Sequence, residues 1–234
     1  MGRLGWAWGF AGAVLVSPLQ AQGGRTVLAV LPFENAGSYG EDEEVSEGLR
    51  LGIPAMLSSA LADRAGVRVA EPSRVAQALE ARHLRSGGRL DAATAGQVGK
   101  ATGARYSVTG SFADFYGKFR INARVVDTET GGIVKVVSND EASLQDRARL
   151  GLIIQAVSEK IAAAVGLPPL PSDAASSRAG ALPTEALTQY SRGLLYESRG
   201  DKDKAADAYQ HALSAYPEYP EARDALRRMG PISR

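Results

Sequence analysis

Hydrophobic and polar positions alternate along two neighbouring segments in the middle of the chain, within residues 103–132. The apolar positions are Tyr106, Val108, Gly110 and Phe112 in the first segment and Phe119, Ile121, Ala123 and Val125 in the second. A period of two predicts β-strands that have one face on a core and the other on water. The polar positions between them, which we expect to face water, are Ser107, Thr109, Ser111, Arg120, Asn122 and Arg124.

Turn-forming residues follow both predicted strands. Tyr116 and Gly117 separate the two strands, and residues 127–132 follow the second one, with glycines that reach positive φ without strain. The sequence of this stretch shows no catalytic motif, metal-ligand cluster or phosphate-binding loop. The pattern describes a sheet, and it therefore favours assembly or binding over catalysis.

The segment before this sheet predicts a buried strand and a long helix. Residues 26–33 are a continuous apolar run, which we expect to form a strand buried on both faces and ended by Pro32, with a loop over residues 34–40. Residues 41–44 are acidic and favour the first turn of a helix. A calcium or magnesium site would need ligands that converge in space, which a continuous run does not provide. The apolar stripe of the predicted helix is Val45, Leu49, Ile53, Leu57 and Leu61.

Further elements follow on both sides of the alternating segments. We expect a strand at residues 67–70, a helix capped by Ser73, a helix of small residues capped by Asp91 that lies close to the sheet, and a C-cap at Gly103. A third strand at residues 133–138 and a helix at residues 144–165 complete the series. The order β-α-β-α-α-β-β-β-α predicts an α/β fold, a mixed sheet that ends in an antiparallel meander and is covered by helices.

The last quarter of the chain has a different character. Residues 167–183 are rich in Pro, Ala and Ser and predict a linker, and residues 184–234 predict a small all-α unit. Residues at the spacing of one tetratricopeptide (TPR) repeat are Gly193, Tyr196, Ala205, Tyr209, Ala212 and Pro217. Gln189 and Arg192 depart from that pattern, and a third helix is expected at residues 220–229. Because one repeat makes no stable groove, it must pack on the α/β domain, pair with another copy or stay marginal.

The amino-acid composition and the first 21 residues indicate the cellular compartment of the protein. Residues 1–21 have the pattern of a cleaved signal peptide, with Arg3, a short apolar run and Ala21 at the expected cleavage site, although an uncleaved anchor is the alternative. Without Arg3 the formal net charge falls from +1 to zero, so we expect no nucleic-acid partner. The absence of cysteine excludes a disulfide frame, a thiolate site and a lipidated Cys, so we expect a periplasmic protein that is not a lipoprotein.

Three sequence motifs resemble one known family. They are AVLPFEN at residues 29–35, GARYSVTGS at residues 103–111 and VDTETG at residues 126–131. Together they resemble the periplasmic domain of the CsgG family, and they are similar to the N-terminal domain of TolB-like proteins, which join it to TPR repeats. The resemblance covers residues 25–166, within a predicted domain at 22–166. It implies an α/β envelope domain that binds proteins and forms rings in some members, without catalytic residues or cofactors. The missing Cys and the missing long hairpins depart from the channel-forming members.

Candidate binding residues lie on the central strands. Arg120, Asn122 and Arg124 share one strand face, which is either a solvated face or a subunit contact, and Phe115 and Tyr116 stand at the hairpin tip, where exposed aromatics suggest a partner surface. His83 and His211 are the only histidines and are expected to be solvated, so we expect no histidine-based metal site and assign no metal ligand, while a site made of acidic side chains is left open.

Three hypotheses of function follow. The first is a non-enzymatic periplasmic assembly or scaffold protein that binds envelope proteins or peptides, with self-association and peripheral membrane association left open. The second is an outer-membrane secretion-channel component of the CsgG type. The least favoured is a hydrolase, because no motif places a base near a serine. Its candidate residues would be Ser107, Ser111, Asp114 and Asp127.

Overall fold

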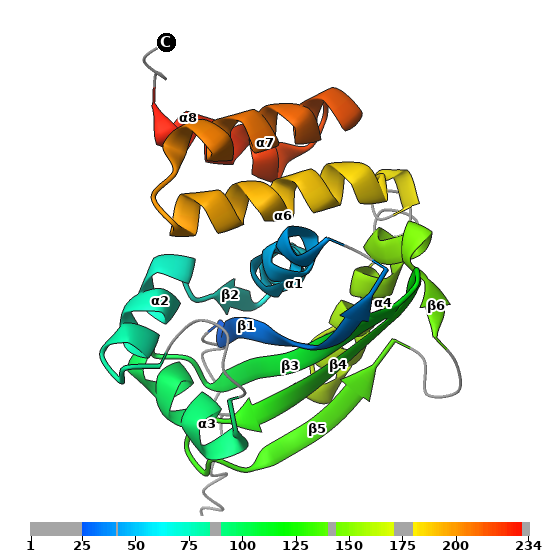
Figure 1. Cartoon of the computed structure of the whole chain (residues 1–234). Helices are drawn as coiled ribbons and strands as arrows, with labels where there is room; N and C mark the ends of the chain where they lie inside the picture. Colours follow the sequence, from blue (N-terminus) through cyan, green and yellow to red (C-terminus); the bar gives the residue numbers. More distant parts are fainter. Residues whose placement is uncertain (1–24, 41, 85–89, 140–143, 171–179, 231–234) are drawn as a thin grey trace, which may run out of the picture.

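A mixed six-stranded sheet forms the centre of the molecule in the computed structural model, which describes residues 25–40, 42–84, 90–139, 144–170 and 180–230 (Figure 1). The strands are β1 (Thr26–Tyr39), β2 (Val67–Val69), β3 (Tyr106–Phe115), β4 (Lys118–Asp127), β5 (Ile133–Ser138) and β6 (Gln145–Asp146). They are ordered β2-β1-β3-β4-β5, and β6 pairs with β4 beyond the end of β5. β1 is parallel to β2 and β3, whereas β3, β4 and β5 form an antiparallel meander. The predicted α/β class and mixed sheet are confirmed.

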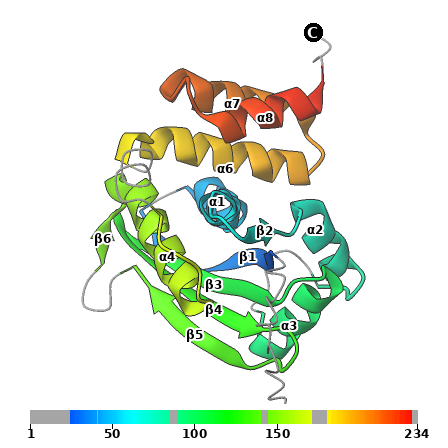
Figure 2. The same ribbon diagram turned by 180° about the vertical axis from the view of Figure 1, so that it is seen from behind.

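Helices cover both faces of this sheet and extend beyond it. They are α1 (Glu43–Ala62), α2 (Pro72–Glu80), α3 (Ala92–Ala101), α4 (Leu150–Ala164), α6 (Thr184–Ser198), α7 (Lys202–Ala215) and α8 (Pro220–Met229), with a short 3-10 helix η1 at Arg147–Arg149. The main core lies between the sheet and the pair α1 and α4, and a second core lies between the opposite face and α2 and α3. Figures 1 and 2 show α6 above α1, with α7 and α8 stacked on it. The order of the elements up to α4 is the predicted one, apart from β6 and η1.

Strand β1 is longer than its sequence indicates. It continues through Pro32 to Tyr39, so the expectations that Pro32 ends the strand and that residues 34–40 form a loop are wrong. Among the described residues, β2 pairs with β1 only from Thr26 to Leu28, so no β2 residue is aligned with Pro32. The pairing with β3 shifts register between Val30 and Phe33, which absorbs the proline. This extension carries β1 up to the tip of the β3–β4 hairpin.

The predicted alternation holds on β4 and fails on the first half of β3. Phe119, Ile121, Ala123 and Val125 are fully buried, as expected. Ser107 and Thr109 are buried as well, at 0% and 1% exposure, so their expected exposure to water is wrong. The reason is α3, which lies so close that a Cβ on Gly99 would be 1.8 Å from the Ser107 hydroxyl oxygen. That hydroxyl donates a hydrogen bond to the carbonyl of Ala95 at 2.8 Å.

The structure confirms two of the four predicted helix ends and corrects the other two. Asp91 caps α3 by accepting a hydrogen bond from the Thr94 N–H at 2.7 Å, and Gly103 follows the helix with φ 75°, both as predicted. Ser73 is not a cap, because Pro72 occupies the first turn of α2 and Glu71 is the N-cap residue. The helix expected from residue 144 begins only at Leu150, since β6 and η1 occupy the preceding residues.

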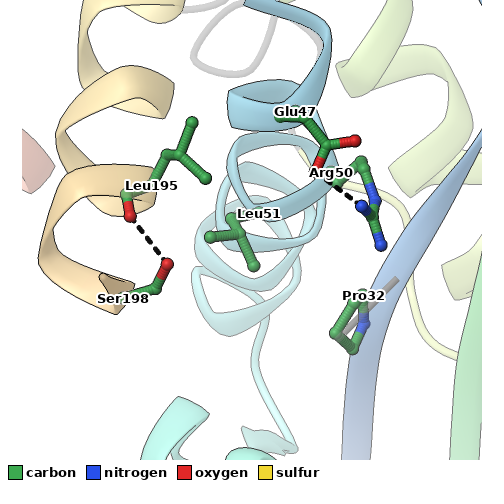
Figure 3. Close-up of a pocket in the computed structure, with 6 residues that line it drawn as sticks. All are labelled: Pro32, Glu47, Arg50, Leu51, Leu195 and Ser198. Atoms are coloured by element: carbon green, nitrogen blue, oxygen red, sulfur yellow. Dashed lines mark hydrogen bonds and ion pairs between the residues drawn. The ribbon is translucent and has the colours of Figure 1, made fainter. Parts of the chain in front are cut away.

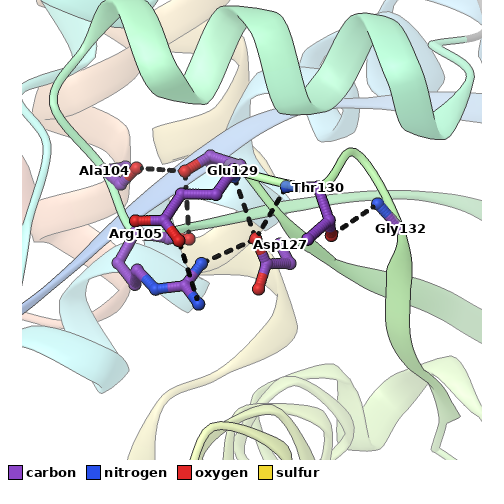
Figure 4. Close-up of polar contacts among 7 residues, drawn as sticks. Ala104, Arg105, Asp127, Glu129, Thr130 and Gly132 are labelled. Atoms are coloured by element: carbon purple, nitrogen blue, oxygen red, sulfur yellow. Dashed lines mark hydrogen bonds and ion pairs between the residues drawn. The ribbon is translucent and has the colours of Figure 1, made fainter.

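Two of the three motifs that carry the family resemblance, residues 103–111 and 126–131, are joined by side-chain contacts. Figure 4 shows the turn after β4, where the Asp127 carboxylate accepts hydrogen bonds from the N–H groups of Glu129 at 2.9 Å and Thr130 at 3.1 Å. Arg105, from the other motif, lies 2.6 Å from the same carboxylate. The Thr128 hydroxyl donates to the carbonyl of Ala104 at 2.7 Å. These contacts give both motifs a structural role at the start of the meander.

A pH prediction follows from this turn. The hydrogen bond from Arg105 and those from two backbone N–H groups hold the pKa of Asp127 well below its ordinary value. Such a carboxylate stabilises the fold at pH values above about 4, where the unfolded chain has also lost the proton, and the contribution disappears as the pH falls toward the folded-state value. We expect Asp127→Asn to remove this part of the acid dependence, measured as unfolding in urea between neutral pH and about pH 3. Equal pH dependence in both proteins would contradict it.

The C-terminal helices dock directly on the α/β domain. A Cβ on Gly52 would lie 1.9 Å from the Ser191 hydroxyl oxygen, and one on Gly48 would lie 3.1 Å from the Ser191 backbone, so α1 and α6 touch through these two glycines. Arg192 forms an ion pair with Glu44 of α1 at 2.9 Å. This contact explains why Arg192 departs from the repeat pattern, because its side chain faces a neighbouring helix with a carboxylate.

The C-terminal unit has a tyrosine-rich core of its own. Tyr190, Tyr209 and Tyr219 are buried there, and burial with the hydrogen bond to Glu197 raises the pKa of the Tyr209 hydroxyl. Tyr190 and Tyr219 therefore belong to the core of the helical unit and not to its surface. Gly193 lies under the Tyr209 ring, where a Cβ would come within 2.3 Å. The helix-turn-helix is therefore present, while its assignment as a TPR repeat stays a prediction. The expected linker falls largely outside the described residues.

Candidate protein-binding surface

One face of the sheet is only partly covered by helices. We call this face the outer face; α1 and α4 pack on the opposite face, whereas α2 and α3 cover the outer face only in part. The register aligns Glu34 of β1 with Ser111 of β3, Asn122 of β4 and Ser138 of β5 in one row across it. The next row aligns Thr109, Arg124 and Val136. Side chains in these rows share the face because alternate residues of a strand point the same way.

All five predicted binding residues lie on this face or at its end. Arg120, Asn122 and Arg124 alternate along β4, and of these three Asn122 is the exposed one while the two arginines are half-buried. Arg124 donates a hydrogen bond to the carbonyl of Leu90 at 3.1 Å, which fixes its guanidinium beside the start of α3. The predicted strand face is therefore polar and partly ordered by its own contacts.

Three aromatic rings gather at the hairpin end of the outer face, and we call them the aromatic tip. Phe115 and Tyr116 belong to the hairpin, while Tyr39 is the last residue of β1. The Tyr39 ring stacks on Phe115 with centroids 5.5 Å apart and on Tyr116 with centroids 6.5 Å apart. Their exposed fractions are 53% for Tyr39, 42% for Phe115 and 79% for Tyr116. The tip is an exposed aromatic patch whose members are held against one another.

The sequence pattern does not indicate Tyr39, because this residue lies in the stretch 34–40 that is predicted to be a loop after Pro32. The Tyr39 carbonyl accepts a hydrogen bond from the Tyr116 N–H at 3.0 Å, which joins the two chain segments at the tip. Gly40 must be small there, since a Cβ would lie 2.6 Å from the Tyr116 ring. The signal that could have indicated this ring is Tyr39 followed by Gly40, a tyrosine and a glycine that come where an extended segment ends.

A buried carboxylate braces the hairpin that carries the tip. Asp114 is 1% exposed, and its carboxylate accepts a hydrogen bond from the Gly117 N–H at 2.8 Å. Its other oxygen lies 3.2 Å from the Arg147 guanidinium, and the Arg147 N–H donates to the Gly117 carbonyl at 2.8 Å. The Thr184 hydroxyl of α6 donates to the Arg147 carbonyl at 3.0 Å. The turn residues Tyr116 and Gly117, with φ of 52° and 83°, are thus connected to the C-terminal helices.

The candidate residues for hydrolysis occupy separate structural positions. Ser107 bonds to α3, Asp114 braces the hairpin and Asp127 holds the turn after β4. Ser111 lies on the outer face, where its register neighbours are Glu34 and Asn122. Within the described part of the chain, no group of three or more His, Asp or Glu side chains is placed to hold a metal ion. His83 and His211 are both exposed.

A small cavity lies apart from the outer face, between β1, α1 and α6 (Figure 3). Its volume is about 190 Å³, below the roughly 300 Å³ at which small-molecule sites begin. Across its wall Glu47 and Arg50 form an ion pair at 2.6 Å. The residues that line it are Pro32, Glu47, Arg50, Leu51, Leu195 and Ser198. We assign no ligand to it.

Comparisons with known proteins give a weak structural likeness. No protein-family model matches this chain, and no curated protein matches it. The C-terminal domain of LpoB from Salmonella enterica is 16% identical with a TM-score of 0.39, covering 49% of this chain and 81% of that one. TolB from Acinetobacter baumannii is 15% identical with a TM-score of 0.40, covering 60% and 28%. Lipoprotein GNA1162 from Neisseria meningitidis is 17% identical with a TM-score of 0.38, covering 58% and 96%.

These scores are too low to carry an argument about function. The three structures are a domain of LpoB, a TolB and a lipoprotein, and neither a CsgG channel nor a TPR protein is among them. Membership of the CsgG or TolB-like family therefore stays a prediction, as does the channel hypothesis. In the described segments no helix combines the length and apolar character needed to cross a membrane. The predicted signal peptide lies outside the described residues.

Proposed function

We propose that this protein is a non-enzymatic envelope scaffold that binds other envelope proteins through the aromatic tip and the adjoining outer face. The observation that carries the proposal is the stack of Tyr39, Phe115 and Tyr116, three exposed aromatic rings held together at one end of the sheet. The envelope location rests on the predicted signal peptide and the family resemblance.

The composition of this surface fits protein recognition. Tyr, Phe and Arg are enriched in the cores of protein interfaces, and the tip and the outer face supply all three. The tip rings are already ordered by stacking and by the braced hairpin, so little side-chain entropy remains to be lost when a partner covers them. Burial of exposed apolar rings away from water lowers the free energy of the complex. A partner that buries the tip and contacts Asn122 beside it would use both properties.

We propose that the C-terminal helices support this surface and are not the main binding groove. Helix α6 contacts α1 on one side and α7 on the other. Its first residue, Thr184, bonds to η1, which in turn holds Asp114. We therefore propose an α/β domain at residues 22–166 and a helical unit at residues 184–234 that works as one body with it. A TPR-like partner groove would need a helical face that this packing already uses.

The double variant Phe115→Ala/Tyr116→Ala tests the proposal. We expect it to reduce capture of partner proteins from an envelope extract about tenfold or more, because aromatic hot spots contribute 2 kcal/mol or more each. The measurement is quantitative mass spectrometry of proteins retained by the immobilised chain. The matched control is Tyr216→Ala, a half-buried tyrosine of the helical unit, after both variants are shown to be folded. Equal retention by the parent chain, the tip variant and the control would contradict the proposed function.

A further inference from the structure

Strand β5 is the last strand in the sheet order and presents an unusual edge. β4 pairs with one side of it, and no strand of the described residues follows on the other side. Ile133 is 50% exposed, Val134 is 43% exposed and Val136 is 57% exposed. Three exposed β-branched residues in a six-residue strand are a strong strand-forming sequence beside free backbone groups.

The edge carries some protection against uncontrolled pairing, but it is incomplete. Lys135 lies in the middle of β5 and is exposed, and a register shift opposite Val125 and Val126 leaves Val134 as an extra residue. Lysines and bulges are the devices by which native sheets discourage association of their edges. Here they interrupt a strand that stays apolar on both sides of the lysine. This combination suits a selective edge, one that rejects some strands and accepts others.

We propose that the β5 edge binds an extended segment of a partner protein by strand addition, and that this segment carries an acidic residue opposite Lys135 and apolar residues opposite Ile133 and Val136. The inference deepens the proposed function, on which it rests, by naming the form and charge of the partner segment. Backbone hydrogen bonds to β5 supply the affinity in this mode of recognition, and the alternating side chains supply specificity.

The register predicts which side chains the added strand would meet. Val136 aligns with Arg124 and Ile133 with Val126, so both lie on the outer face, where the added strand needs apolar side chains. Lys135 aligns with Val125 and points to the opposite face. Directly opposed residues in neighbouring strands interact, and opposite charges there are favourable. A segment that alternates apolar and acidic residues satisfies both faces at once.

Charge favours such a segment over a second copy of this chain. An antiparallel pair of two β5 strands around a two-fold axis would bring the two Lys135 side chains together or within about two positions of each other on one face, where like charges are unfavourable. Arg124 lies beside the edge, and Lys160 of α4 donates to the Ser138 carbonyl at 2.6 Å at the end of β5. These cations attract an acidic strand and repel a basic one.

Synthetic peptides test the inference directly. The probe is a short peptide that alternates valine with glutamate, and the controls are the same peptide with lysine for glutamate and with alternate backbone nitrogens methylated. We expect only the glutamate peptide to slow amide hydrogen exchange in residues 133–137 and to bind in fluorescence anisotropy. Methylation on the bonding edge removes the hydrogen bonds and should abolish binding, although the side chains are unchanged.

A charge swap supplies the matched variants. Lys135→Glu should weaken the glutamate peptide roughly three- to tenfold and let the lysine peptide bind instead, whereas Lys202→Glu, an exposed change on α7, should alter neither. Equal binding of the methylated peptide would overturn strand addition, and equal binding of the glutamate peptide by Lys135→Glu would overturn the acidic character assigned to the segment. No binding by the parent chain would overturn both. Concentration-dependent dimerisation that protects the same amides would assign the edge to a second copy. Phe115→Ala/Tyr116→Ala should keep peptide binding, so the two proposals fail separately.

Discussion

Gly52→Leu should separate the C-terminal helices from α1 and lower the free energy of unfolding by about 3 kcal/mol. Even the Cβ of a new side chain would lie 1.9 Å from the Ser191 hydroxyl oxygen and 2.6 Å from the Ser191 Cβ, so α6 has to move away. That movement would also break the Arg192–Glu44 ion pair and the hydrogen bond from Ser59 to Glu221 of α8. The measurements are urea unfolding and hydrogen exchange in α6.

A paired variant separates steric conflict from a general weakening of α1. Gly52→Ala should be destabilising by the same conflict, and combining it with Ser191→Gly should recover part of the loss, because the second change removes the two closest atoms. Additive losses in the double variant would show that the helices do not meet through these residues. Wild-type stability of Gly52→Leu would contradict the docked arrangement.

Asp114→Ala should cost about 2–3 kcal/mol of stability and should also reduce partner binding. The carboxylate is buried and holds the Gly117 N–H and Arg147, so its loss leaves a hairpin turn and a half-buried guanidinium without a shared acceptor. The estimate lies below that for a fully buried pair because 24% of the Arg147 side chain is exposed. The tip would then lose its fixed position. The measurements are urea unfolding and the partner-capture assay.

The control for this change lies on the neighbouring strand. Lys118 pairs with Asp146 at 3.8 Å, and both side chains are more than half exposed, at 57% and 58%. Lys118→Ala should therefore change stability by less than about 1 kcal/mol. If Asp114→Ala proved as mild as this control, the buried brace would not be what holds the tip.

Much of the fold was predictable because local patterns agree with the final packing. The stripe along α1, the alternation on β4 and the cap at Asp91 each depend on residues close in sequence. The small residues of α3 correctly indicated a close approach to the sheet, although the sequence could not show that Ser107 lay under them. The predicted partner residues Phe115 and Tyr116 needed only the position of the hairpin turn.

The remaining features depend on contacts that no local pattern contains. Tyr39 joins the tip only because β1 continues past Pro32, and that continuation is tolerated only because β2 ends early along it. The docking of α6 depends on two glycines in α1 that meet Ser191, far away in sequence. The exposed edge at β5 follows from strand order, which alternation does not specify.

Site-specific photo-crosslinking in the producing cell would show whether the aromatic tip is the surface that contacts partner proteins. A photoreactive amino acid would replace Tyr116 at the tip in one protein and His211, an exposed residue of α7, in another. We expect a discrete crosslinked partner from position 116, lost when Phe115→Ala is added, and none from position 211. Crosslinks from position 211 alone would contradict this expectation. So would the absence of crosslinks from both positions while the chain is still retained in a native complex.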